Sequence, residues 1–153
     1  AKISKKKLPL TAEEYCNYYK ICDALPFAFT DIEMVFNEEK KAVDWIFRYG
    51  NEALATLAKL PLDMMIGSSF SSLFSNMDAK WLQVYERATL YGETLEIMDY
   101  SPEIDTNLKI ICFPTFPGHC GCILFNADKM KSISEENHLV RLVEVSMKNN
   151  SSK

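Results

Sequence analysis

The sequence predicts an α+β fold in which a block of helices stands between two strands and three further strands. Two neighbouring stretches alternate apolar and polar residues with the two-residue period of a strand, and a polar turn at 37–41 joins them into a hairpin. A block of helical periodicity follows at 51–91. Three more alternating stretches, at 93–100, 107–116 and 119–126, complete the predicted sheet.

The two strands of the hairpin are expected to turn one apolar face toward the core. Ile32 and Met34 alternate with acidic residues on the first strand. The second strand shows the same period, which places on one face the residues Val43, Trp45, Phe47 and Tyr49. Unequal faces of this kind are typical of a sheet that is covered on one side.

One domain accounts for the whole chain, with helical segments flanking a core. Thr11 and Glu14 fit a capping box that starts the first helix, and Ser132 with Glu135 fits a second box. Pro26 ends the first helix, because proline disfavours the helical conformation of the preceding residue. The predicted segments are a flexible arm over 1–10, an N-terminal flanking helix over 11–25, a core over 26–128, and a C-terminal helix and tail over 129–153.

The helical block carries its own start and stop signals. Asn51 is a suitable N-cap for a helix over 51–60. Pro61 suits the first position of a short helix that ends before Gly67. Asp78 caps a longer helix, in which the buried stripe is predicted to contain Trp81, Val84, Tyr85 and Ala88.

Composition limits the classes of partner. The chain has 153 residues, 48% of them hydrophobic and 25% charged, with a net charge of −4. An acidic chain lacks the dense basic field that nucleic acid or an anionic membrane surface requires, so we expect neither as a partner. Five cysteines without disulfide spacing indicate reduced thiols, and no apolar run reaches the roughly 18–20 residues of a membrane span. We therefore expect a cytoplasmic protein.

Three segments resemble the PAS family. Asp44 to Leu54 resembles the second PAS strand and the Asn-x-Ala that opens the first cross-face helix. Met64 to Phe70 is similar to the helix and Gly-Ser-Phe segment that follow, and Gly118 to Phe125 is similar to the last strand. The resemblance covers roughly residues 22–128 and depends on order and spacing more than on any one motif.

The resemblance implies the PAS fold, a five-stranded antiparallel sheet with helices crossing one face between strands two and three, and a role as a sensory input module. The domain is similar to those that precede GGDEF-type cyclic-dinucleotide synthases in bacterial signalling proteins, which implies an output domain in a longer chain. Many PAS domains end the last strand with Asp-Ile-Thr, which couples the sheet to the output helix. Here the chain reads Asn126-Ala127-Asp128, so the coupling contact is left open, and Asp128 is a candidate for a shifted version.

A PAS domain places its ligand pocket between the sheet and the cross-face helices. The residues expected to line it here, and to bind a small ligand, are Phe47, Leu57, Met65, Phe70, Phe74, Trp81, Tyr85, Ile97 and Phe113. The alternative is that these side chains fill the core and leave no cavity. The family comparison argues against flavin, because 67–76 contains no cysteine, and against haem, because 78–91 contains no histidine.

The sequence offers no convincing catalytic or metal-binding motif. His119, Cys120 and Cys122 could suggest a metal, but a Cys-x-Cys spacing on a strand suits zinc poorly. The only other histidine is His138, and no nucleophile motif accompanies it. We therefore expect no enzymatic activity, although a triad-like arrangement around a histidine would revive that class.

The flanking helices suggest a route for signal output. Apolar stripes on 12–24 and 133–147 are wider than a solvated helix needs. Each helix either folds back on the open face of the sheet or contacts a second chain, and we expect a homodimer formed through them. The leading hypothesis is a sensor that binds a small molecule or a partner and relays this to an output domain. The alternative is a ligand-free scaffold for dimerisation or protein interaction.

Overall fold

A computed structural model describes residues 8–75 and 78–129. All pairings in its sheet are antiparallel, and the strand order is β2-β1-β5-β4-β3. The elements in chain order are α1 (Ala12–Tyr18), the 3-10 helix η2 (Lys20–Ala24), β1 (Ala28–Phe36), β2 (Ala42–Gly50), α2 (Glu52–Ala58), α3 (Leu62–Met65), α4 (Phe70–Leu73), α5 (Ala79–Tyr91), β3 (Leu95–Ser101), β4 (Thr106–Pro114) and β5 (His119–Asn126). The helix predicted at the C-terminus, within 129–153, lies outside the described residues.

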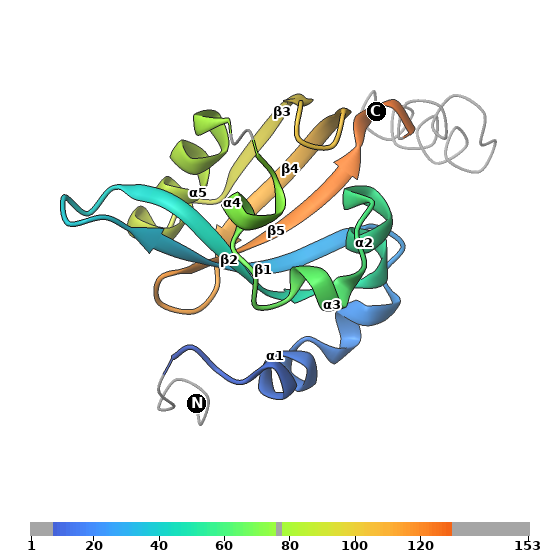
Figure 1. The fold of residues 1–153 in the computed structure, drawn as a ribbon, viewed down its shortest axis with the longest axis horizontal. Helices are drawn as coiled ribbons and strands as arrows, with labels where there is room; N and C mark the ends of the chain where they lie inside the picture. Colours follow the sequence, from blue (N-terminus) through green and yellow to red (C-terminus); the bar gives the residue numbers. More distant parts are fainter. Residues whose placement is uncertain (1–7, 76–77, 130–153) are drawn as a thin grey trace, which may run out of the picture.

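The helices occupy two sides of the sheet. Helices α2 to α5 follow β2 in the chain and cross one face, whereas α1 lies against the other face (Figure 1). Strands β1 and β5 are central, and β2 and β3 form the edges. This strand order, with all cross-face helices inserted between the second and third strands, is that of the PAS fold. The predicted α+β PAS-type fold class is therefore confirmed.

The N-terminal segment begins as predicted but does not form one continuous helix. The Thr11 hydroxyl accepts from the Glu14 amide at 3.1 Å, and the Glu14 carboxylate accepts from the Thr11 amide at 3.0 Å, so the capping box is present. The α-helix ends at Tyr18, and a 3-10 turn replaces the remainder of the predicted 11–25 helix. The break is at Tyr19, whose hydroxyl donates to Asp31 in the sheet.

The predicted arm over 1–10 is packed at its inner end. Leu10 is buried, and its amide donates to the Tyr15 hydroxyl at 3.2 Å. Residues 1–7 lie outside the described part of the chain. Burial of Leu10 against Tyr15 agrees with the hydrophobic staple that often accompanies a capping box.

A β-bulge in the hairpin places Tyr49 on the opposite face of the sheet from the one predicted. Ile32 pairs with Phe47, but Asp31 pairs with Tyr49, so Arg48 is an extra residue in β2. The bulge reverses the alternation. Tyr49, predicted to share a face with Phe47, therefore packs on the opposite side, beneath α1.

The outer edge of β2 is covered by the loop between α3 and α4. The Gly67 amide donates to the Phe47 carbonyl at 2.7 Å, and the Phe47 amide donates to the Ser68 carbonyl at 3.1 Å. Such cover satisfies backbone groups that would otherwise invite another strand. Phe70, which follows this loop, is thereby held over the inner face of the sheet.

Candidate functional site

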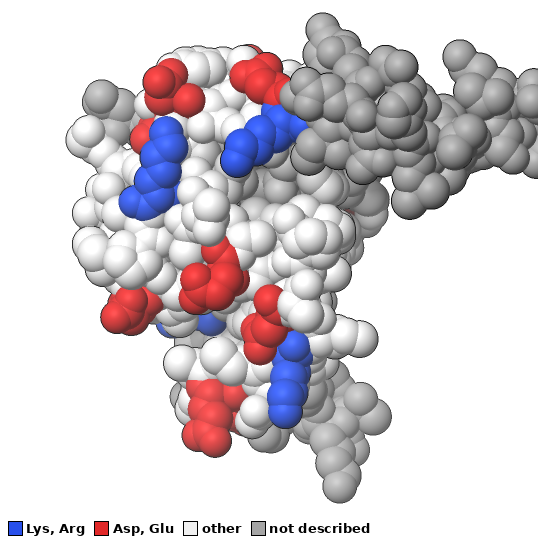
Figure 2. Space-filling view, turned by 90° about the vertical axis from the view of Figure 1, so that its right-hand side faces the viewer, with Lys and Arg blue, Asp and Glu red and all other residues white. Residues whose placement is uncertain are grey.

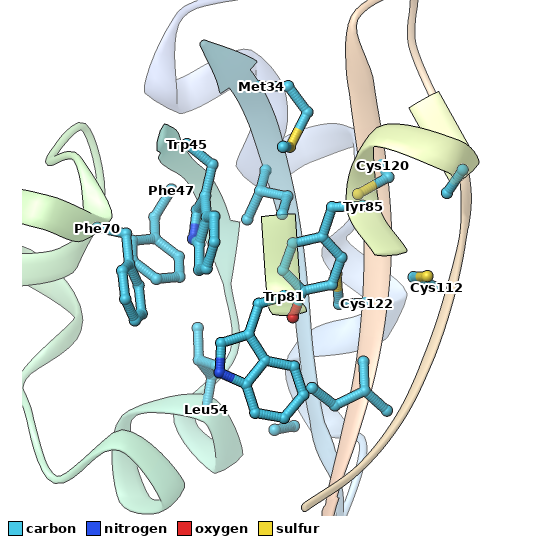
Figure 3. Packing of buried hydrophobic residues seen from close by; sticks show 14 of the residues in the cluster. Met34, Trp45, Phe47, Leu54, Phe70, Trp81, Tyr85, Cys112, Cys120 and Cys122 are labelled. Atoms are coloured by element: carbon cyan, nitrogen blue, oxygen red, sulfur yellow. The ribbon is translucent and has the colours of Figure 1, made fainter. Parts of the chain in front are cut away.

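A cavity of about 60 Å³ lies between the inner face of the sheet and helices α2 to α5. Aromatic rings supply much of the wall: Trp45 and Phe47 from β2, Phe70 from α4, and Trp81 and Tyr85 from α5. Figure 3 shows the rings of Trp45, Phe47 and Phe70 gathered on one side, with Trp81 facing them across the space. The rings of Trp45 and Phe70 have centroids 4.2 Å apart. The cavity is thus bounded by packed aromatic side chains.

Most of the residues predicted to line a pocket lie together around this cavity. Seven of the nine are on its wall, namely Phe47, Leu57, Met65, Phe70, Phe74, Trp81 and Tyr85. Ile97 packs against the same core but is not part of the wall. These positions leave open whether the residues bind a ligand.

Phe113 is the one predicted lining residue that lies on the wrong face. It packs in the cluster beneath α1, opposite Gly121 of β5. On β4 the residues that face the helices are Leu108, Ile110 and Cys112. The strand period is two, so a misjudgement of one residue moves a side chain to the other face.

Glu103, in the β3–β4 turn, was not predicted from the sequence, and it anchors one wall of the cavity. One carboxylate oxygen accepts from the indole N–H of Trp81 at 3.2 Å and from the Asp78 amide at 3.0 Å. The other accepts from the Ser101 hydroxyl at 2.6 Å. A single acidic residue in a turn has no sequence signal that separates it from a solvated charge.

The polar groups around the cavity already have partners within the protein. The Thr30 hydroxyl donates to the Tyr49 carbonyl at 2.7 Å, and the Trp81 indole N–H and the Ser101 hydroxyl donate to Glu103. Burial raises the pKa of Tyr85 well above its usual range, with Cys122 as a hydrogen-bonding neighbour, so the phenol is neutral. A cavity of this kind suits an uncharged, largely apolar molecule.

Asn51 joins the N-terminal segment, the sheet and α2. Its side-chain oxygen accepts from the amides of Phe29 at 3.1 Å and Leu54 at 3.0 Å. Its amide group donates to the carbonyls of Cys22 and Phe27, each at 3.0 Å. The side chain is buried, so it caps α2 as predicted and also fixes the start of β1.

A second polar cluster lies on the opposite face of the sheet, beneath α1. The Asp31 carboxylate accepts from the Tyr19 hydroxyl and lies 2.9 Å from Nδ1 of His119. Asp31 and His119 are 0% and 1% exposed. The Tyr49 hydroxyl donates to Asp23 nearby. These contacts attach the N-terminal segment to β1, β2 and β5.

The pairing of His119 with Asp31 does not amount to a catalytic triad. Nε2 of His119 is buried and has no hydrogen-bond partner among the described residues. The rings of Tyr15 and Phe116 lie 5.9 Å and 5.7 Å from the imidazole. Catalysis by such a pair requires a nucleophile within reach of the free ring nitrogen, and no hydroxyl or thiol of the described residues hydrogen-bonds to it.

The residues considered for a metal lie on opposite faces. Cys120 and Cys122 pack in the core beneath α5, together with Cys112, whereas His119 faces α1. Burial raises the pKa of the Cys112 thiol to about 12, so the thiol stays protonated. Within residues 8–75 and 78–129, no group of three or more His, Cys, Asp or Glu side chains is placed to hold a metal ion.

The buried tyrosines predict a loss of stability in alkali. Desolvation raises the pKa of Tyr15 from 10.0 to about 12, and burial also raises the pKa values of Tyr19 and Tyr49. An unfolded phenol ionises near pH 10 while the folded one stays protonated, so the contribution to stability is complete below pH 10 and is lost as pH rises toward 12. Each such tyrosine adds up to about 1.4 kcal/mol per pH unit to the slope.

Urea unfolding between pH 8 and pH 11.5, with phenolate absorbance as a second signal, measures this slope. The Tyr15→Phe variant should show a shallower decline above pH 10. An unfolding free energy that stays level to pH 11.5 would contradict the prediction.

One contact near the end of β5 involves Asp128, the candidate for coupling the sheet to an output helix. Asp128 accepts from the Asn107 side-chain amide of β4 at 3.2 Å. The Asn126 side chain accepts from the Lys129 amide at 3.1 Å, which caps the turn that leaves the sheet. Asp128 is therefore attached to the sheet, at the point where the described chain ends.

Comparisons with known proteins give a limited result. No protein-family model matches the chain, and no curated protein matches it. Among solved structures, the chain resembles an RNA-binding light-oxygen-voltage receptor with 15% sequence identity and a TM-score of 0.44. The likeness covers 92% of this chain but only 40% of the receptor chain. RNA binding and light sensing are named for that receptor, and we take the fold of this chain from its own strand order.

The described surface adds two observations. No helix among the described residues is long and apolar enough to cross a membrane. Figure 2 shows the side of the molecule that carries α2 and the end of β5, where basic and acidic side chains are scattered among uncharged ones. That face presents no continuous field of one sign.

Proposed function

We propose that the chain is a sensory input domain. It binds a small, uncharged, largely apolar molecule between the sheet and the cross-face helices. The observation that carries this proposal is the cavity itself, whose wall contains seven of the residues that the PAS resemblance singled out. A concave space lined by aromatic rings is a common form of small-molecule site.

The size of the cavity limits the ligand. Its volume is about 60 Å³. Drug-sized ligands occupy pockets of roughly 300–1,000 Å³. The ligand therefore has only a few heavy atoms, unless the helices move outward to admit a larger one.

The same small volume supports the alternative function, a ligand-free scaffold for dimerisation or protein interaction. A core that is nearly filled can serve as a rigid support for flanking helices without any ligand. The two functions differ in one measurable property, because only a sensor takes up an uncharged molecule of suitable size.

Relay is the second part of the proposal. The N-terminal segment is attached to β1 through Asp31, which also contacts His119 of β5, and to β2 through Tyr49. The chain beyond β5 leaves the sheet next to Asp128. A ligand that shifts α2 or α5 alters the strands to which these segments are attached. We propose that flanking segments pass the change to an output domain in a longer chain, or to a second copy in a homodimer.

Xenon binding tests the sensor proposal. Xenon is an uncharged probe that enters dry apolar cavities. We expect ¹²⁹Xe NMR to show a bound resonance for the wild-type protein. Ala58 lines the cavity at the end of α2, so Ala58→Leu should fill the space and weaken binding at least tenfold.

The matched control is Ala55→Leu on the same helix, at a position outside the cavity wall, and its xenon affinity should stay within twofold of wild type. Absence of bound xenon from the wild-type protein would favour the scaffold. Native mass spectrometry of the purified domain gives a second test, through co-purified small molecules and the mass of a dimer.

A further inference from the structure

A larger groove lies beside the cavity. Its volume is about 600 Å³, and it runs between α2 and the ends of β4 and β5. Ala53 and Thr56 of α2 form one bank, and Phe27 and Phe125 contribute to the other. The two phenylalanine rings are 5.2 Å apart, so that side of the groove is firmly packed.

Two side chains separate the groove from the cavity. Leu57 of α2 and Leu124 of β5 are the residues that line both spaces. Each is half-buried and packs against the main core. Displacement of these two side chains would join the cavity to the groove. Both are apolar and form no hydrogen bond, so only packing against the core opposes the displacement.

The helix that carries Leu57 is fixed by hydrogen bonds at both ends and by the buried side chains of Leu54 and Ala58. Asn51 holds the N-terminal end through buried hydrogen bonds. At the other end, the exposed ammonium of Lys59 donates to the carbonyl of Ile104 at 3.2 Å, across the boundary between cavity and groove. Leu57 lies between these anchors on a helix of seven residues, and an exposed hydrogen bond contributes little to holding it closed.

We propose that the groove is the access route to the cavity, and that Leu57 and Leu124 select slender, uncharged ligands. This inference rests on the proposed sensor function and specifies how its site is reached. A charged group would lose hydration between two leucine side chains with no partner to replace the water, which is costly. A wide ligand would require both side chains and the end of α2 to move together. Selection therefore takes place at the boundary as well as inside the cavity.

The test separates access from binding. Thr56 is exposed, and it lines the groove but not the cavity, so Thr56→Trp fills the groove and leaves the binding space unchanged. We expect ¹²⁹Xe saturation transfer to show exchange at least tenfold slower than in wild type, with the equilibrium affinity within twofold. Glu52→Trp places the same ring on the same helix outside the groove, and its exchange rate should stay within twofold.

The outcomes are distinct. Wild-type exchange in Thr56→Trp, with binding retained, would overturn the access route and leave the sensor proposal intact. Equal slowing in Glu52→Trp and Thr56→Trp would also overturn it, because the effect would then come from the helix and not from the groove. A wild-type protein that binds no xenon would overturn both proposals. Far-UV circular dichroism identifies a variant that fails to fold, and Ala53→Leu then provides a smaller groove-filling change.

Discussion

Replacement of Asn51 by alanine is expected to lower the free energy of unfolding by about 3–5 kcal/mol. The change removes the N-cap of α2, which contributes about 1 kcal/mol in a typical helix. It also leaves the buried Phe29 amide without this partner, which costs about 1–3 kcal/mol, while the part-buried carbonyls of Cys22 and Phe27 contribute less because water can reach them. Urea or guanidinium unfolding measures the loss.

The Asn51→Asp variant separates the contribution of the side-chain oxygen, which accepts hydrogen bonds, from that of the side-chain N–H group, which donates them. Aspartate keeps the oxygen that accepts from Leu54 and Phe29, but it loses the N–H donors and places a carboxylate near two carbonyl oxygens. We expect it to be destabilised, with α2 still capped and its amides still protected in hydrogen exchange. A loss below about 1 kcal/mol in Asn51→Ala would show that water replaces the missing contacts and that Asn51 is only a cap.

Much of the secondary structure could be predicted because local signals and burial agree. Thr11 with Glu14, Asn51 and Asp78 cap the helices that follow them, as their sequence context indicates. Gly92 ends α5 with a φ of 67°, a conformation that glycine adopts without strain. Alternation located all five strands, although β3 is only partly buried on either face.

The predictions failed where contacts between distant segments override the local pattern of apolar and polar residues. The bulge at Arg48 changes the face of Tyr49, and nothing in the alternating sequence indicates an extra residue. Tyr19 interrupts the predicted first helix, because its hydroxyl reaches Asp31, which is distant in sequence. Phe113 was placed on the wrong face because both faces of β4 are apolar near its end.

The candidate site was predictable in its lining but not in its volume or its supports. Seven lining residues followed from the PAS resemblance, since they occupy inward positions on the cross-face elements. The volume of about 60 Å³ depends on how rings such as Trp45 and Phe70 pack, which no pattern of residue types encodes. Glu103 and the groove beside Leu57 depend on contacts between segments far apart in the chain.

Loss of the Asp31 carboxylate is expected to release the N-terminal segment from the sheet. In Asp31→Ala, the Tyr19 hydroxyl and Nδ1 of His119 lose their buried partner, which should lower the free energy of unfolding by about 3–5 kcal/mol. The Tyr19 amide, which donates to the Tyr15 carbonyl at 3.0 Å, should exchange with solvent much faster. Unfolding measurements and hydrogen exchange together separate global from local loss.

A double-mutant cycle with Tyr19→Phe isolates the contact between Tyr19 and Asp31. Neighbours in one hydrogen-bond network typically show coupling of about 0.5–3 kcal/mol, and we expect a value in the upper half of that range because the contact is buried. Additive effects of the two substitutions would contradict the assignment of Asp31 as the anchor.

The position of Asp31 makes this prediction informative about function. The cluster beneath α1 and the cavity lie on opposite faces of β1 and β5, so release of the N-terminal segment removes no residue from the cavity wall. We therefore expect Asp31→Ala to keep its xenon affinity within twofold of wild type while the N-terminal segment becomes exposed to exchange.

Added xenon should slow exchange of the Tyr19 amide in the wild-type protein if the two faces are coupled through the sheet, as a relay requires. Exchange that is indifferent to xenon, in a protein that binds it, would limit the N-terminal segment to a structural role.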